Sequence, residues 1–406
     1  MFFKLEIKRI FSKRVNRFVI GVALILAVIF SGFAVSSNRY VDQDGNASTG
    51  FDATRKLTAS KSLWKGTLTE DKILKAYEEN KAAYQRYSME ELDAKYGSLL
   101  QPMADVKDFM ISVLTPDSEY DETVLEQASR EEMESFYDLY RQNQKAQARE
   151  YGKTEEQVKY IEKQYEKVKL PVHYEPYGSW DVMILYGETY GIILAIIIGF
   201  LCAGIFADDF QTKAYPIFFA AKYGRSKAIK IKILAGITVA TAVYWVGIGL
   251  LSVISFGILG VSGWNTPYQM QQAYSIYAIT YGQYYLIVAL CGYIASLLAA
   301  ALSMLVAAKM HTVSVAICIP FFLYCVCPFI GRAMHGLEIF WDLMPMVLIN
   351  IQEYAKRPFV FRIGSYVSSQ IPFIMVLYTA VSLLLLPLIY RTFRRYGHLF
   401  QDRSCV

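Results

Sequence analysis

The amino-acid sequence predicts an all-α integral membrane protein: six transmembrane helices, an amphipathic N-terminal helix and a large helical extracellular domain. Three observations carry this prediction. Six apolar stretches are long enough to cross a bilayer, basic residues gather in every second segment that joins these stretches, and one long joining segment is polar. Of the 406 residues, 54% are hydrophobic and 19% are charged, whereas soluble domains carry about 25% charged residues. Charge is concentrated in residues 37–180 and is sparse in 181–330. One part of the chain therefore suits water and the other lipid.

Residues 1–17 predict an amphipathic helix that lies in the cytoplasmic lipid interface. Apolar side chains recur at helical spacing, and basic side chains flank them. A plain basic anchor beside the first crossing is compatible with the same pattern. The apolar face is formed by Phe3, Ile7, Ile10, Phe11 and Val15.

Six apolar segments are predicted to cross the membrane, because a spanning helix needs about 20 mainly apolar residues. The first is longer than the ~7–15 residues of a signal-peptide core, so we interpret it as an uncleaved anchor. The fourth is rich in alanine and serine, which let helices approach closely in lipid and predict a place inside the bundle. The six segments are 18–36, 181–206, 233–261, 284–308, 312–331 and 371–390.

The distribution of lysine and arginine predicts the orientation, because basic residues are retained on the cytoplasmic side. With six crossings, the basic stretches 1–17, 207–232 and 391–406 all fall on one side. The connections 262–283 and 332–370 contain few basic residues. Both termini are therefore predicted to be cytoplasmic in a multi-pass plasma-membrane protein.

Residues 37–180 are predicted to form a water-facing helical domain outside the cell. Helix-forming residues dominate this segment, and 121–150 is a candidate for one long helix. The segment contains no cysteine, so disulfides cannot hold it together. The apolar connection 332–370 predicts a pair of short helices, broken at Pro345, at the outer membrane surface.

The cytoplasmic segment 207–232 carries the most informative pattern. Two acids end the second crossing, aromatic residues follow, and a basic cluster leads into the third crossing. Four exposed aromatic side chains beside a membrane predict a docking surface for a partner. A short helix packed on its own bundle is the alternative. The candidate residues are Asp208, Asp209, Phe210, Tyr215, Phe218, Phe219 and Arg225.

In and after the same segment, an acid is followed in order by an apolar pair, an arginine and a lysine. The residues at these places are Asp208 or Asp209, Phe218-Phe219, Arg225 and Lys232. With this order, the amphipathic N-terminal helix and six crossings, the chain resembles the ABC-2 type permeases, the membrane subunits of ABC exporters. The outward helix pair around Trp341 to Pro345 is also similar to that family.

The resemblance covers roughly residues 1–36 and 181–395. The chain departs from the family at Lys213-Ala214, where the family has Gly-Thr, and at the inserted Pro216. These departures bear on the geometry of the short helix in this segment and not on its placement after the second crossing. The large domain after the first crossing has no counterpart in the simplest members.

The resemblance implies a permease subunit of an ATP-binding cassette exporter that moves an amphipathic substrate, peptide or lipid-like, out of the cell. The sequence has no GxxxxGK[ST] phosphate loop, so ATP hydrolysis is expected on a partner chain. The expected partners are an ABC ATPase dimer, a second permease subunit in a homo- or heterodimer, and membrane lipid, without nucleic acid. We expect no cofactor or metal. The missing ATPase domain and the cysteine-free outer domain favour a bacterial membrane.

Glu188, inside the second crossing, is a candidate pathway residue, because an acid within a membrane is a functional candidate by default. A solvated glutamate near the outer interface fits the sequence equally well. A different class of function also remains open. In that alternative the chain is a membrane sensor or immunity protein that captures an extracellular peptide through residues 37–180.

Overall fold

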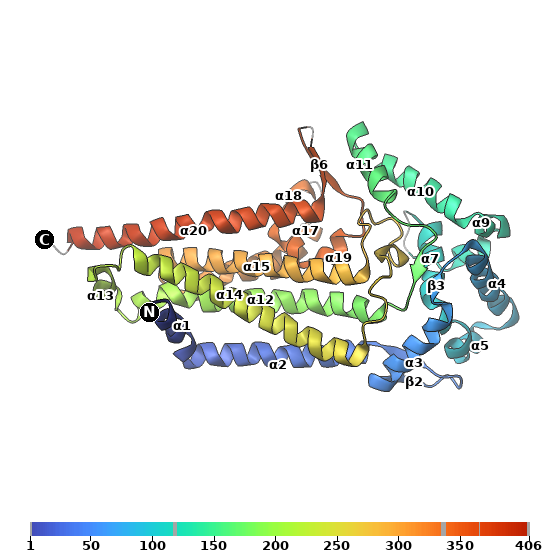
Figure 1. Cartoon of the computed structure of the whole chain (residues 1–406), viewed down its shortest axis with the longest axis horizontal. Coiled ribbons are helices and arrows are strands. Elements are labelled where there is room, and N and C mark those ends of the chain that lie inside the picture. Colours follow the sequence, from blue (N-terminus) through green and yellow to red (C-terminus); the bar gives the residue numbers. More distant parts are fainter. Residues whose placement is uncertain (1, 117–119, 334–337, 365, 404–406) are drawn as a thin grey trace.

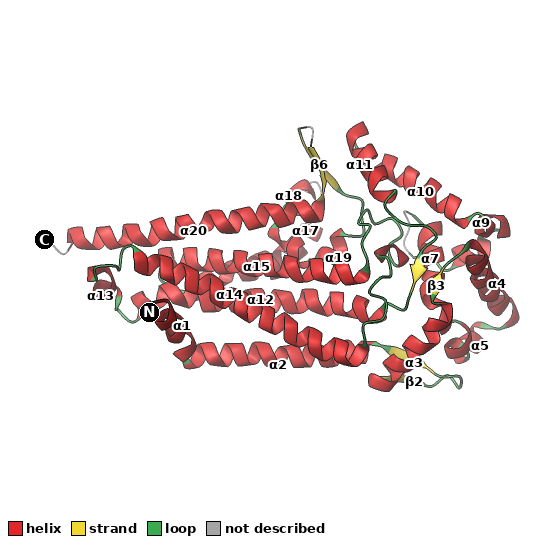
Figure 2. Ribbon diagram, in the orientation of Figure 1, coloured by secondary structure: helices red, strands yellow, loops and turns green. Residues whose placement is uncertain are grey.

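The computed structural model describes residues 2–116, 120–333, 338–364 and 366–403. The protein is elongated, with a bundle of long helices at one end and a domain of shorter helices at the other (Figure 1). Regular structure is almost all helical, and the strands are short (Figure 2). Helix α1 and the last turns of α20 lie at the bundle end far from the domain, which we call the terminal end. The opposite end is the domain end.

Within the described residues, six helical segments are long and apolar enough to cross a membrane, which confirms the predicted number of apolar helices of spanning length. They indicate a multi-pass membrane protein. Several extend beyond the predicted apolar segments, because an apolar count finds only the part that fits in lipid. They are α2 (Arg14–Ser37), α12 (Gly178–Gln211), α14 (Lys227–Leu259), α15 (Tyr281–Met310), Val313–Gly331 and α20 (Gln370–Arg403). The fifth comprises α16 (Val313–Phe321), a π-helical turn η4 (Phe322–Val326) and most of α17 (Cys327–Ala333).

Helix α12 is the centre of the bundle and packs against α2, α14, α15 and α16. Small residues permit close approach: a Cβ at Gly199 would lie 3.0 Å from both the Pro320 ring and the Ser303 hydroxyl. The predicted position of the fourth crossing inside the bundle is confirmed, since the alanine and serine positions of α15 are buried. The Tyr244 hydroxyl donates to the Ala289 carbonyl oxygen at 2.6 Å, which joins α14 to α15.

The N-terminal helix is shorter than the predicted 1–17. Helix α1 (Phe2–Ser12) ends where Lys13 takes an extended conformation, and residues 14–17 already belong to α2. The Asn16 side-chain amide donates to the Ile10 carbonyl oxygen at 2.8 Å, which satisfies a carbonyl group left free at the helix end. The break lets α1 turn across the terminal end and contact α14.

The domain between the first two long helices is helical, with two small antiparallel sheets that the sequence did not predict. The predicted single helix over 121–150 is wrong, because Ser129 begins a new helix through a reciprocal capping box with Glu132. Phe109 packs edge-to-face on Phe136 and Tyr140, with ring centroids 5.5 Å and 5.9 Å away. The helices are α3 (Phe51–Lys61), η1 (Ser62–Trp64), α4 (Glu70–Arg86), α5 (Met89–Ala94), α6 (Tyr96–Leu99), η2 (Gln101–Met103), α7 (Ala104–Leu114), α8 (Thr123–Gln127), α9 (Arg130–Glu134), α10 (Phe136–Tyr151) and α11 (Glu155–Tyr165). The paired strands are β1 (Arg39–Val41) with β2 (Ala47–Thr49) and β3 (Gly66–Thr67) with β4 (His173–Tyr174).

The loop between α14 and α15 fastens this domain to the bundle. The Tyr140 hydroxyl donates to the Ala273 carbonyl oxygen, and the Tyr165 hydroxyl donates to the Tyr274 carbonyl oxygen at 2.8 Å. In return, the Tyr274 hydroxyl donates to the Val113 carbonyl oxygen at 2.6 Å. Buried hydrogen bonds therefore link the domain and the loop in both directions.

The connection before α20 contains short helices and a β-hairpin that the sequence did not predict. A short helix ends at Asp342 and a 3-10 turn begins at Pro345, so the helical segments are interrupted at the predicted proline, which the first turn of a helix accepts. Arg362 in the hairpin lies 3.2 Å from Glu156 of α11. Residues 334–337 of the predicted helix pair lie outside the described residues. The elements are α18 (Glu338–Asp342), η5 (Pro345–Ile349), α19 (Ile351–Tyr354), β5 (Val360–Ile363) and β6 (Tyr366–Ser369); the loop before α15 contains η3 (Tyr268–Met270).

Candidate functional site

The site residues predicted in segment 207–232 lie together at the terminal end, between the end of α12 and the start of α14 (Figure 1). The acids and Phe210 belong to the last turn of α12. The other aromatic residues belong to a short helix, α13 (Tyr215–Ala220), and Arg225 lies in the turn that follows it. The structure therefore gathers seven of the eight candidates in one place.

Helix α13 forms despite the inserted proline, because Pro216 occupies the first turn, where no backbone N–H is needed. Lys213 separates it from α12 with a left-handed φ of 56°. At its other end, a Cβ at Gly224 would collide with the Phe218 carbonyl oxygen, so only glycine fits there. The Arg225 Nε donates to the Phe219 carbonyl oxygen at 3.1 Å and closes the turn.

Asp209 is the centre of a buried ion network. One carboxylate oxygen accepts from the Arg9 guanidinium at 2.8 Å, and the other lies 2.8 Å from the Lys232 ammonium. Asp209 is 5% exposed and Lys232 is 2% exposed. Both cations also donate to the Ile205 carbonyl oxygen, Arg9 at 3.0 Å and Lys232 at 2.9 Å. Glu6 completes the network, 2.6 Å from Arg9 and 3.6 Å from Lys232.

The network contains two cations and two anions, so its charges balance. Such a buried set is held by mutual attraction and by hydrogen bonds that replace water, and removal of one member leaves another charge without compensation. Its members come from α1, α12 and α14, and Arg9 and Asp209 are 200 residues apart in the chain. The network therefore holds α1 against the ends of two long helices.

A second ion pair supports the same junction. The Lys13 ammonium, at the break between α1 and α2, contacts the Asp208 carboxylate. Burial lowers the pKa of the Lys13 ammonium, and the positive charges of Arg9 and Lys232 add to the effect. Both predicted acids therefore form ion pairs with the N-terminal part of the chain.

The aromatic residues of the segment pack on α20. The Phe210 ring stacks on Tyr215, with centroids 5.2 Å apart, and lies 3.7 Å from the His311 ring. Phe219 lies 5.2 Å from Phe393 of α20. This arrangement exists because α20 continues beyond its apolar part and brings Phe393 over α13.

The prediction of four exposed aromatic side chains is wrong for Phe219, which is 2% exposed. Phe210, Tyr215 and Phe218 are half-buried. The contacts match the alternative of a short helix packed on its own bundle. The apolar side chain that faces outward is Ile217, which is 78% exposed.

Glu188 lies elsewhere, toward the domain end of α12. Its carboxylate accepts a hydrogen bond from the Gln352 backbone N–H at 2.7 Å, in the first turn of α19. The carboxylate thereby joins α12 to the connection before α20. Glu188 and Asp209 are separated by 21 positions of one helix, or about 30 Å. The structure therefore does not bring this candidate to the terminal end.

Comparison with protein-family models, with curated proteins and with solved structures finds no match to this chain. The resemblance to the ABC-2 type permeases therefore rests on the residues themselves. Among the described residues, no group of three or more His, Cys, Asp or Glu side chains is placed to hold a metal ion.

Sequence reasoning missed how the site is assembled. It expects basic side chains on the flanks of the N-terminal helix and a basic cluster before the third crossing, and it pairs neither with the two acids. An acidic pair at the end of an otherwise apolar helix was the available signal, since such acids need cations nearby. The aromatic partners from α20 carried no comparable signal.

We predict that Asp209→Leu destabilises the detergent-solubilised protein by about 3–5 kcal/mol, because Lys232 then remains buried without its nearest anion. Lys232→Met is expected to have a similar effect. The double variant is expected to be more stable than the sum of the single effects predicts, since no unpaired charge remains at this position. Thermal unfolding followed by circular dichroism measures all three.

The matched control is Asp44→Asn, at an exposed turn of the domain. This change is expected to alter stability by less than about 0.5 kcal/mol. Strictly additive effects of Asp209→Leu and Lys232→Met would show that the two side chains do not interact.

Proposed function

We propose that the chain is a permease subunit of an ATP-binding cassette exporter and that a separate ATPase binds it at α13. The observation that carries the proposal is the position of this short helix. It stands at the terminal end between two long helices, packs on α20, and presents Ile217 outward. The residue pattern shared with the ABC-2 type permeases adds support.

The contacts of α13 give a route by which a push from an ATPase would reach the bundle. Phe219 would transmit movement to α20 through Phe393, and Phe210 would transmit it to the turn after α15 through His311. The last turn of α12 is tied to α1 and α14 through Asp209. Packed aromatic and ionic contacts are suited to this role because they move as units.

The proposed substrate is amphipathic, either a peptide or a lipid-like molecule, and it is moved out of the cell. A bundle of closely packed apolar helices supports this class. The proposed transporter has two permease subunits, identical or different, and an ATPase dimer. In this arrangement the terminal end is cytoplasmic and the helical domain is extracellular.

An ATPase that binds α13 should no longer co-purify with the chain when the outward face of α13 becomes charged. We predict that the wild-type chain co-purifies with an ABC ATPase from native membranes in mild detergent. Ile217→Lys is expected to reduce the recovered ATPase by about tenfold or more, because a buried apolar contact is replaced by a charge. Quantitative mass spectrometry of the purified material provides the measurement.

Leu63→Lys is the matched control, since Leu63 is an equally exposed apolar residue of the domain, 75% exposed against 78% for Ile217. It is expected to leave ATPase recovery unchanged. A wild-type chain that is recovered without any ATPase contradicts the proposal. Capture of an extracellular peptide without substrate-stimulated ATP hydrolysis would instead support the sensor.

The orientation has its own test, in a cysteine-free background that carries one new cysteine at a time. We predict that Lys153→Cys, at an exposed domain position, reacts with a membrane-impermeant maleimide on intact cells. Lys222→Cys, exposed beside α13, is expected to react only after lysis. The reverse labelling would place the domain inside the cell.

A further inference from the structure

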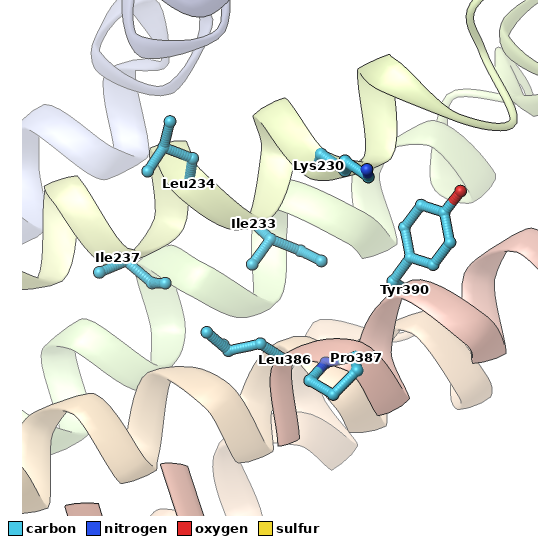
Figure 3. A pocket seen from close by; sticks show the side chains of 7 residues that line it. All are labelled: Lys230, Ile233, Leu234, Ile237, Leu386, Pro387 and Tyr390. Carbon is cyan, nitrogen blue, oxygen red and sulfur yellow. The ribbon is translucent and has the colours of Figure 1, made fainter. Parts of the chain in front are cut away.

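An apolar groove of ≈ 400 Å³ runs between α14 and α20 near the terminal end (Figure 3). It is open along one side. Lys230 and Tyr390 lie at the same end of the groove, and Ile237 lies at the other. The walls between them are formed by Ile233, Leu234, Leu386 and Pro387.

The groove exists because its two helices pack mainly on other partners. Helix α14 packs chiefly on α12 and α2, and α20 packs chiefly on α15. Their direct contact is limited, and apolar side chains remain uncovered along the gap. Leu234, for example, is 53% exposed. An apolar surface of this kind requires an apolar neighbour.

The position of the groove relative to the membrane follows from helix geometry. Helix α20 begins at Gln370, and Tyr390 comes 20 residues later, about 30 Å along the axis, which matches the thickness of a hydrocarbon core. Arg391 follows directly, and Arg394 lies one helical turn after Tyr390. Tyrosine with adjacent arginines is typical of the membrane–water interface. The polar end of the groove therefore lies at that interface, and the apolar walls extend into the hydrocarbon.

Two cations lie near the Tyr390 ring, and one of them, Lys230, lines the groove. The Lys230 ammonium lies 5.9 Å from the centroid of the Tyr390 ring, and the Arg394 guanidinium lies 6.0 Å from the same centroid. Among the ion pairs of the described residues, neither cation has an Asp or Glu partner. Two cations close together at the interface attract an anion.

We infer that this groove binds an anionic phospholipid of the surrounding membrane. An acyl chain lies along Ile233, Ile237 and Leu386, and the headgroup phosphate lies beside the Tyr390 ring, where Lys230 and Arg394 both approach. The apolar length and the charged end match the two parts of a phospholipid, whereas a neutral lipid headgroup gains little from the cations. The inference requires only a membrane around the bundle and is independent of the proposed transport function.

The test uses the full-length chain, purified in detergent and titrated with phosphatidylglycerol or with phosphatidylcholine of the same acyl chains. Native mass spectrometry counts the lipids retained. The wild-type protein is expected to retain phosphatidylglycerol preferentially. In the double variant Lys230→Gln/Arg394→Gln, the apparent affinity for phosphatidylglycerol is expected to fall by about 10-fold to 30-fold.

The matched control is Arg14→Gln/Arg17→Gln, which removes the same charge from exposed positions at the start of α2. It is expected to keep the preference. Equal loss in both double variants would overturn the inference, because it would reflect net charge and not the groove. Unchanged binding in Lys230→Gln/Arg394→Gln would overturn it as well.

A second variant tests the apolar part without changing charge. Leu234→Trp fills the groove and is expected to abolish retention of the bound phosphatidylglycerol. Val253→Trp, at a position of α14 that is 74% exposed and far from the groove, is expected to have no effect. A Leu234→Trp variant that keeps its lipid but loses self-association would assign the groove to a second copy of this chain and overturn the inference.

Discussion

The buried carboxylate of Asp209 sets the constraint on which the terminal end depends. A lone acid in this position would be strongly unfavourable; Lys232 of α14 offsets part of that penalty, and Arg9 offsets the rest while α1 stays docked. The same set of charges therefore fixes the positions of α1, the start of α14 and the end of α12 relative to one another. Helix α13 follows directly from the end of α12, so the position of the outward Ile217 depends on the same charges.

The two ends of the molecule are joined by α12, a helix of 34 residues, about 50 Å long. At the domain end, tyrosine hydrogen bonds fasten the helical domain to the loop before α15. On α14, Lys232 points into the ion network while Lys230, two positions away and so on another face, borders the apolar groove. An occupied groove would therefore stabilise the helix turn that also supplies the network.

The long helices could be predicted from the sequence, because hydropathy over about 20 residues is a local property of the chain. The ion network could not, since Arg9 and Asp209 meet across 200 positions. Burial of Phe219 also escaped prediction, because it depends on where α20 passes after its apolar part has ended. The split at Ser129 was readable from its capping box with Glu132, but the helix-forming composition around it obscured the signal.

Hydrogen–deuterium exchange of α1 tests most directly whether Asp209 holds the N-terminal helix on the bundle. The comparison is between the wild-type protein and Asp209→Asn, which removes the charge and keeps the shape. We expect the amides of residues 2–12 to exchange about tenfold faster or more in the variant, while the buried middle of α12 stays protected. Equal exchange of α1 in the two proteins would contradict the central role of this carboxylate.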